Sequence, residues 1–497
     1  MASHGSSSTW RGRALAPVLV YLSAVVAVIS SLGAPLIPTI AAAEHVSLTE
    51  AQWSLTITLL VGAVATPAMG RMGDGPLRRA TILGTLAIVM VGNVLAALPF
   101  GFGCLIVGRG LQGVGLGLIP LSIATARQSL PAHRSRSAIG LLSVTVVAGV
   151  GLGYPLTGLI AEEFGFHASF WFGAAVSAAA LVAAVLVVPG TRHLSPRPLD
   201  LLSAVLFGTV LAGLLLVLSE GESWGWTSPA LLGMLAASLV CLAVWITVEL
   251  RTDNPLVNLR QLGNRVVLTA AVVGLIAGTG TYLLLSLVTR LAQTPQSPGH
   301  GFGVSIVVAG LILLPFSVGT LVANKVVQQV AHRVSWHLTL PLSCAVILAS
   351  MLMFGLARTG LWELFAVMGV AGLGVGTAFA LIPEMVVTAV PHSEVGSAIG
   401  FNQVLRYVGF TTGSALSAVV LESRTPSGTV LPEAGGYTVA AVLGVVICAA
   451  AIVTAIVLPG RRRSELELPA TGAQPTVVGG SEHEEVSPAG KAEQVRG

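Results

Sequence analysis

The chain has 497 residues, of which 54% are hydrophobic and only 9% are charged. Soluble proteins carry about 25% charged residues, so this composition excludes an ordinary soluble fold and indicates a membrane protein. The formal net charge of +4 does not indicate a nucleic-acid partner, because the basic residues are spread over short loops and form no single patch.

Fourteen apolar blocks follow one another along the chain, and each is long enough to cross a hydrocarbon layer of about 30 Å as a helix. We therefore expect an all-α integral membrane protein with fourteen spans. The first block is too long for a signal-peptide core and is followed by further spans, which favours an uncleaved helix. The blocks lie near residues 14–40, 53–70, 80–99, 102–126, 137–160, 168–189, 199–218, 228–248, 266–289, 302–323, 337–356, 362–387, 396–420 and 437–459.

The basic residues fall mainly on alternate loops. With the N-terminus inside the cell, the cytoplasmic loops hold eighteen Lys and Arg residues, whereas the outer loops hold only Arg290, Arg358 and Arg424. Cytoplasmic loops carry such an excess in membrane proteins, and miscounting one span would destroy it. We therefore expect a multi-pass protein of the cell membrane with both termini cytoplasmic.

One pattern of small residues occurs twice. The stretches SAIGLLSVTVVAGVGLG and SAIGFNQVLRYVGFTTG begin 260 residues apart, and both end on two glycines four residues apart, Gly149 with Gly153 and Gly409 with Gly413. Small residues at this spacing let helix backbones approach closely. An even number of spans separates the copies, so the repeat predicts two parallel halves of six helices.

This layout predicts five segments. A cytoplasmic tail (1–13) precedes an N-terminal six-helix bundle (14–189), and a linker with two extra helices (190–265) leads to the second six-helix bundle (266–459). The polar stretch 460–497, rich in Gly, Pro and Glu, is expected to be a disordered cytoplasmic tail.

The loop after the second block, GRMGDGPLRR, resembles the G-x-L-A-D-R-x-G-R-[RK] loop of the major facilitator superfamily. The matching residues are Gly70, Asp74, Arg78 and Arg79. Asp74 can accept hydrogen bonds from arginines or from a helix N-terminus, and such a contact would keep the cytoplasmic side closed in one state. The alternative for the two arginines is a purely topogenic role.

The fourth block, LIVGRGLQGVGLG, is similar to the R-x-x-Q-G-x-G pattern of the same family, with Arg109 and Gln112 in place. An arginine near the middle of a span costs about 2.5–3.5 kcal/mol, so Arg109 should face the bundle interior and have partners there. The resemblance implies a role in proton coupling, and the alternative is a structural hydrogen bond between helices.

The fifth block contains GVGLGYPLTG, which resembles the antiporter signature G-x-x-x-G-P-x-x-G-G. Gly149, Gly153 and Gly158 fit this signature, while Tyr154 replaces its proline and Pro155 is shifted by one. Together with the fourteen blocks, the motifs resemble the drug:proton antiporter branch of the major facilitator superfamily. The resemblance implies the major facilitator fold, two six-helix bundles with two inserted central helices.

Only the second copy of the repeat contains an arginine. Arg406 lies near the middle of its span with Asn402 and Gln403 close by, and we expect these three residues on a central substrate cavity, a helix–helix contact being the alternative. No Asp or Glu lies in the middle of a predicted span. Glu384, near the cytoplasmic end of the twelfth block, is the candidate proton carrier unless it simply lies among the lipid headgroups.

Embedded arginines without an embedded carboxylate suit neutral, zwitterionic or anionic substrates better than dicationic ones. The four cysteines lie far apart inside apolar blocks, and no metal-binding or catalytic constellation is visible in the sequence. We therefore expect no enzymatic activity and no cofactor beyond the proton-motive force.

The sequence favours a monomeric secondary transporter that exports amphipathic small molecules, such as a drug, an antibiotic or a secondary metabolite, by proton antiport with alternating access. The alternative is an importer of a polar nutrient, a sugar or an organic acid. Aromatic residues make up only 5% of the chain, which weakly disfavours a sugar site. Expected partners are the substrate, protons and the lipid bilayer.

Overall fold

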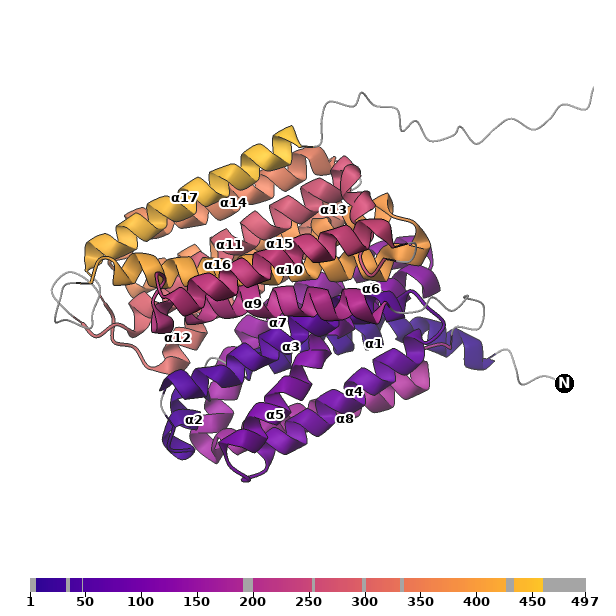
Figure 1. Ribbon diagram of the computed structural model, residues 1–497, viewed down its shortest axis with the longest axis horizontal. Helices are drawn as coiled ribbons and strands as arrows, with labels where there is room; N and C mark the ends of the chain where they lie inside the picture. Colours follow the sequence, from indigo (N-terminus) through magenta and orange to yellow (C-terminus); the bar gives the residue numbers. More distant parts are fainter. Residues whose placement is uncertain are drawn as a thin grey trace, which may run out of the picture. The chain divides into compact units, whose positions relative to one another are not determined.

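The computed structural model describes residues 6–32, 36–46, 48–190, 200–252, 255–296, 301–330, 335–425 and 433–458. Within these ranges the regular structure is entirely helical, without a strand (Figure 1). The tail predicted over 460–497 and residues 191–199 of the linker predicted over 190–265 lie outside the described residues. The described residues belong to one unit, Met1–Gly460.

In the described part of the first half there are eight α-helices and one short 3-10 helix. They are α1 Ser6–Ser31, α2 Ile37–Ala43, α3 Leu48–Gly73, α4 Arg78–Ala97, α5 Phe102–Gly113, η2 Val114–Gly117, α6 Leu118–Ser129, α7 Ala132–Phe164 and α8 Phe166–Val187.

The inserted pair and the second half follow in the same manner. They are α9 Leu201–Trp224, α10 Pro229–Arg251, η3 Leu259–Gly263, α11 Arg265–Gln293, α12 Ile306–Ile312, α13 Leu314–Val330, α14 Trp336–Leu356, α15 Leu361–Ala389, η4 His392–Glu394, α16 Val395–Glu422 and α17 Ala434–Val457.

Polar residues just before several helices explain where these helices begin. The side chains of Asp200, Ser228, Asn264, Ser305 and Ser335 each accept a backbone N–H from the first turn of α9, α10, α11, α12 and α14. Such caps satisfy amide groups that have no partner within the helix.

Twelve helical segments of the described chain are long and apolar enough to cross a membrane, and α7, which bends by 42° between Ala132–Val146 and Gly151–Phe164, would be a thirteenth. The apolar part of α9, Leu202–Leu218, is shorter than a span needs. The fourteenth span therefore stays a prediction.

The first predicted block needs correction at its C-terminal end. The helix α1 begins at Ser6, inside the predicted tail 1–13, and its apolar part Gly12–Ser31 starts close to the predicted residue 14, but the helix ends at Ser31 instead of running to residue 40. A separate short helix, α2, starts at Ile37 with Pro38 in its first turn. Proline lacks the backbone N–H that a continuous helix would need, but it fits the start of a new one.

The helices of the first half pair in a pattern that recurs in the second half. In the first half α1 packs on α7 and α8, α4 packs on α5 and α8, and α3 packs on α5. In the second half α11 packs on α16 and α17, α14 packs on α15 and α17, and α13 packs on α15. Figure 1 shows α4 running beside α8, and α14 beside α17.

The glycines of the sequence repeat occupy equivalent contacts in the two halves. A Cβ atom at Gly153 of α7 would meet the Ser31 side chain of α1, and one at Gly413 of α16 would meet the Thr279 carbonyl of α11. These residues are glycine because the two helix backbones approach too closely for a side chain. The two halves then meet through α3 with α16 and through α7 with α12, α13 and α15.

The inserted helices are attached to this central contact. α9 packs on its partner α10 and also on α3 and α16. The rings of Phe207 and Trp245 stack between α9 and α10 with centroids 4.4 Å apart. Glu249, buried on α10, accepts hydrogen bonds from the Ser203 hydroxyl and from the backbone N–H of Val257, so it ties the pair to the loop that follows.

That loop reaches the start of α16. The Ser397 hydroxyl donates to the Leu256 carbonyl at 2.6 Å, and Asn258 Nδ2 donates to Glu394 at 3.1 Å. The residues between the inserted pair and the second half are therefore held by the helix that also contacts α3.

Candidate functional site

A cavity of about 620 Å³ lies between the two halves. Its lining comes from helices of both halves and from the inserted segment, and includes Arg109, Tyr154, Trp226, Tyr282, Arg406 and Phe410. On α16, which begins at Val395, the lining runs from Arg406 to Ala418, and on α3, which ends at Gly73, it runs from Leu55 to Leu59. The cavity therefore occupies the helix halves that lie away from Asp74.

Arg109 is fully buried on α5 and is held by three acceptors. Its Nε donates to the Ser54 carbonyl at 2.9 Å, and its Nη1 donates to Gln112 Oε1 at 2.6 Å and to the Ile29 carbonyl at 3.4 Å. The Nη2 atom is buried without a hydrogen-bond partner among the described residues. The structure thus brings Arg109 and Gln112 together and leaves one donor of the guanidinium unused beside the cavity.

Arg406 also lines the cavity, but its surroundings are aromatic. Its guanidinium lies 4.7 Å from the ring centroid of Phe379 and 5.9 Å from that of Phe410, both within the range of cation–π attraction. The residue is 3% exposed, and its Nε has no hydrogen-bond partner among the described residues.

The other two residues expected on the cavity, Asn402 and Gln403, are buried but are not among the residues that line it. Asn402 Nδ2 instead donates to the Ala270 carbonyl of α11 at 3.2 Å. Asn402 lies one helical turn before Arg406 and is held against α11 by this hydrogen bond, so the lining of the cavity on α16 begins beyond it, at Arg406.

The end of the helices where α3 stops and α16 starts, here called the Asp74 end, is closed by contacts between the halves. Asp74 is 3% exposed, and its two carboxylate oxygens accept the backbone N–H groups of Gly396 at 2.7 Å and Ser397 at 2.9 Å. These amides belong to the first turn of α16, where a helix favours negative charge. Gly70 lies against the same turn, since a Cβ there would collide with the Gly396 carbonyl.

The two arginines of the same motif stay within the first half. Arg78 is buried and its Nη1 donates to the Ala124 carbonyl at 3.5 Å, whereas Arg79 donates to the Val185 carbonyl at 2.8 Å. They join the start of α4 to the ends of α6 and α8. Their hydrogen bonds therefore do not contribute to the contact between the halves.

A second contact across the Asp74 end joins α7 to α15. Arg136 Nε lies 2.6 Å from Glu384 Oε1, with the side chains 53% and 24% exposed respectively. Glu384 is thus separate from Arg109 and Arg406: it belongs to the closed end, and it is not among the residues that line the cavity. Sequence reasoning missed Arg136, although it directly precedes the SAIG repeat.

The antiporter motif of α7 faces both its own half and the other. Gly149 and Gly153 pack on α1, while the nearest atom to a Cβ at Gly158 would be Val307 Cγ2 at 4.0 Å. Tyr154 lines the cavity. Pro155 lies against α12, because a Cβ at Gly310 would sit 3.4 Å from its nitrogen.

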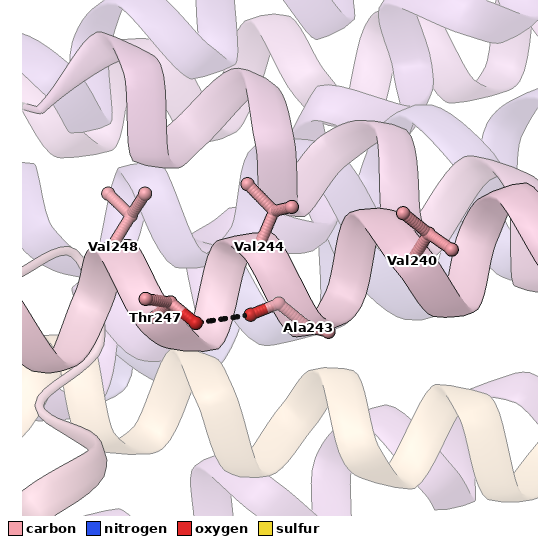
Figure 2. A pocket seen from close by; sticks show the side chains of 5 residues that line it. All are labelled: Val240, Ala243, Val244, Thr247 and Val248. Carbon is pink, nitrogen blue, oxygen red and sulfur yellow. Dashed lines mark hydrogen bonds between the residues drawn. The ribbon is translucent and has the colours of Figure 1, made fainter.

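A smaller hollow of about 370 Å³ lies along α10 (Figure 2). One face of this helix lines the hollow, and the Thr247 hydroxyl donates a hydrogen bond to the Ala243 carbonyl at 2.8 Å. The lining residues are Val240, Ala243, Val244, Thr247 and Val248. A hollow on one apolar helix face suits contact with lipid chains and offers no polar group to a specific ligand. Among the described residues no cluster of His, Cys, Asp or Glu is arranged to hold a metal ion.

Several known proteins resemble this chain along most of its length. The Tetracenomycin C resistance and export protein of Streptomyces glaucescens is 28% identical over 450 residues, 87% of this chain and 80% of that protein. The Multidrug resistance protein Stp of Mycobacterium tuberculosis is 25% identical over 374 residues, 74% of this chain and 68% of its own length. The "Probable actinorhodin transporter" of Streptomyces coelicolor is 28% identical over 391 residues, 74% and 65% of the two chains.

The fold has a solved counterpart. The crystal structure of the human organic anion transporter MFSD10 (TETRAN) superposes with a TM-score of 0.64 over 89% of this chain and 99% of that one, at 15% identity. The sequence profile described as Major Facilitator Superfamily matches residues 19–414. With the paired halves, the central cavity and these matches in agreement, the chain belongs to the Major Facilitator Superfamily.

Proposed function

We propose that this protein exports an amphipathic small molecule, a drug, antibiotic or secondary metabolite, by proton antiport with alternating access. The observation that carries the proposal is a cavity that lies between two similar halves. At the Asp74 end of the helices, away from this cavity, contacts between the two halves close the protein. The relatives named for tetracenomycin C export, actinorhodin transport and multidrug resistance support export as its direction.

The sidedness follows from the charge count of the loops, which favours a cytoplasmic Asp74 end. The cavity then lies in the outer halves of the helices, and the structure corresponds to an outward-facing state. Opening toward the cytoplasm requires the Asp74 oxygens to leave the amides of α16 and Arg136 to part from Glu384.

The ion pair suggests how protons enter the cycle. A proton on Glu384 removes the charge that attracts Arg136 across the two halves and so favours opening of the Asp74 end. Arg109, held by Gln112 and two backbone carbonyls, keeps a fixed positive charge beside the cavity. Substrate and proton each shift the equilibrium only by binding one state more tightly than the other.

Import of a polar nutrient is less well supported by the lining. The hydroxyls of Thr58, Thr281, Thr289 and Thr411 line the cavity, but each donates its proton to a carbonyl of its own helix. A sugar site needs side chains whose donors and acceptors are both free.

The test is drug susceptibility of a hypersensitive bacterial host that expresses the wild type, Arg109→Ala or Arg265→Ala. Arg265 is exposed at the start of α11 and serves as the control. We expect the wild type and Arg265→Ala to raise the inhibitory concentration of an aromatic antibiotic and to expel it until an uncoupler is added. Arg109→Ala should reach the membrane in equal amount but give no resistance. Resistance that an uncoupler does not abolish, or that Arg109→Ala retains, would contradict the proposal.

A further inference from the structure

The charges that face the cavity are all of one sign. Arg109, Arg290 and Arg406 line it, and no Asp or Glu occurs among the described residues that do so. A buried charge is costly unless it is paired. The positive charge of Arg406, which no carboxylate of the described residues pairs, therefore indicates that a ligand supplies the anion.

Arg406 is the residue that most lacks a partner. It is 3% exposed, and no acidic side chain of the described chain forms an ion pair with it. Its guanidinium contacts the rings of Phe379 and Phe410, which offer no oxygen acceptor to its N–H donors. The edge of a guanidinium is the part that matches a carboxylate or another oxyanion in a bidentate manner.

Flat aromatic surfaces adjoin this charge. The rings of Tyr282 and Phe410 stack with centroids 4.3 Å apart and an interplanar angle of 20°, and Tyr407 lies edge-on to Phe410 at 6.2 Å. All three rings line the cavity, and the Tyr407 hydroxyl has no hydrogen-bond partner among the described residues. Such a wall favours a planar aromatic ligand that carries a hydrogen-bonding group.

From these contacts we infer that the cargo is a planar aromatic molecule with an acidic group, a carboxylate, phenolate or enolate. Arg406 binds the acidic group, and Phe410 with Tyr282 contacts the ring. A cationic molecule would be repelled by the arginines, and a neutral one would leave Arg406 without an ionic partner. This inference rests on the proposed export function and specifies its substrate class.

The test compares three fluorescent ligands with the same ring system, 9-anthracenecarboxylate, its methyl ester and 9-aminomethylanthracene. Each is titrated against the full-length protein in nanodiscs of zwitterionic lipid, so that no anionic headgroup competes. A charged hydrogen bond is worth roughly tenfold or more in affinity. We therefore expect the acid to bind at least about tenfold more tightly than the ester and the amine.

Three variants test whether the preference for the acid depends on Arg406. Arg406→Gln should abolish the preference for the acid and leave the affinity for the ester within about twofold. Arg406→Lys should keep part of the preference, because the charge remains but the planar fork is lost. Arg265→Gln, a change at the exposed start of α11, should behave as the wild type.

Three results with the wild type alone would overturn the inference, so the test does not depend on any variant folding. They are equal affinity for the three ligands, tighter binding of the amine than of the acid, and no binding of the acid. A preference for the acid that survives in Arg406→Gln would also overturn it. Uptake by proteoliposomes with an imposed pH gradient separates the two proposals. Gradient-driven movement of the amine alone would refute the substrate class and leave export standing, whereas selective binding of the acid without any gradient-driven movement would support the site and refute proton-driven export.

Discussion

Replacing Asp74 by Asn should open the Asp74 end. In the wild type both carboxylate oxygens are used, one on the amide of Gly396 at 2.7 Å and the other on that of Ser397 at 2.9 Å. Asparagine offers one acceptor oxygen only, and its NH₂ group would face an amide that also donates. One of the two hydrogen bonds is therefore lost, together with the negative charge at the start of α16.

The size of the effect follows from these two losses. A hydrogen bond to a charged group contributes about 1.5–3 kcal/mol, and a charge at a helix N-terminus adds about 0.3–1 kcal/mol. The closed arrangement should thus lose about 2–4 kcal/mol relative to the open one. Since 1.4 kcal/mol is a factor of ten, the ratio of closed to open molecules should fall about 30-fold or more.

Pulsed electron–electron resonance between spin labels measures this ratio. Ala132 at the start of α7 and His392 in η4 are both exposed and lie in different halves near the Asp74 end, so Ala132→Cys and His392→Cys provide the labelling sites in a background without the four native cysteines. The wild type should give mainly the short distance, and Asp74→Asn should add a longer one.

Asp200→Asn is the matched control. Asp200 also accepts a backbone N–H at the start of a helix, from Ser203 at 3.2 Å, but within α9 alone. It should leave the distance distribution unchanged. If Asp74→Asn gives the wild-type distribution over the whole pH range tested, the hydrogen bonds of Asp74 do not hold the halves together and the reasoning fails.

Three further changes test other contacts. Glu384→Gln imitates the protonated side chain and should flatten the pH dependence of export in proteoliposomes, because Arg136 loses its partner at every pH; an unaltered profile would exclude Glu384 as the proton carrier. Gly413→Ala should lower the melting temperature in detergent by several degrees, since overpacking a tight contact costs about 1–3 kcal/mol. The control Gly158→Ala adds a methyl group that meets only ordinary contacts and should leave the melting temperature unchanged. Equal melting temperatures of the two variants would refute the argument that the helices approach too closely for a side chain at Gly413. Glu249→Ala leaves a buried amide without its acceptor, which costs about 1–3 kcal/mol, and melting curves equal to those of the wild type would show that this carboxylate does not anchor the inserted pair.

The sequence predicted the helices well because length and hydrophobicity alone decide whether a segment can cross a bilayer. It also predicted the family, which the profile match over residues 19–414 confirms. The boundaries were less predictable. In the sequence, apolar residues continue from α1 to α2, so hydropathy could not locate the end of α1 at Ser31.

The partners of Asp74 could not be read from side-chain types, because they are backbone amides 322 and 323 residues away. Any residue except proline supplies such an amide N–H, and only the position of a helix start reveals it. A signal was nevertheless present, since Ser397 is the first residue of the second copy of the repeat. The place where the cavity ends, between Asn402 and Arg406, depends on how the halves pack in one state, which sequence spacing does not encode.

The two hydrogen bonds between the inserted segment and the start of α16 bear on whether this segment could be removed from the chain. Excising residues 200–264 would remove Leu256 and Asn258 and leave the Ser397 hydroxyl and the Glu394 carboxylate without these partners. A deletion that joined α8 directly to α11 would therefore need substitutions at Glu394 and Ser397 that compensate for the lost contacts. The inserted pair therefore supports the same helix start whose Gly396 and Ser397 amides donate to Asp74.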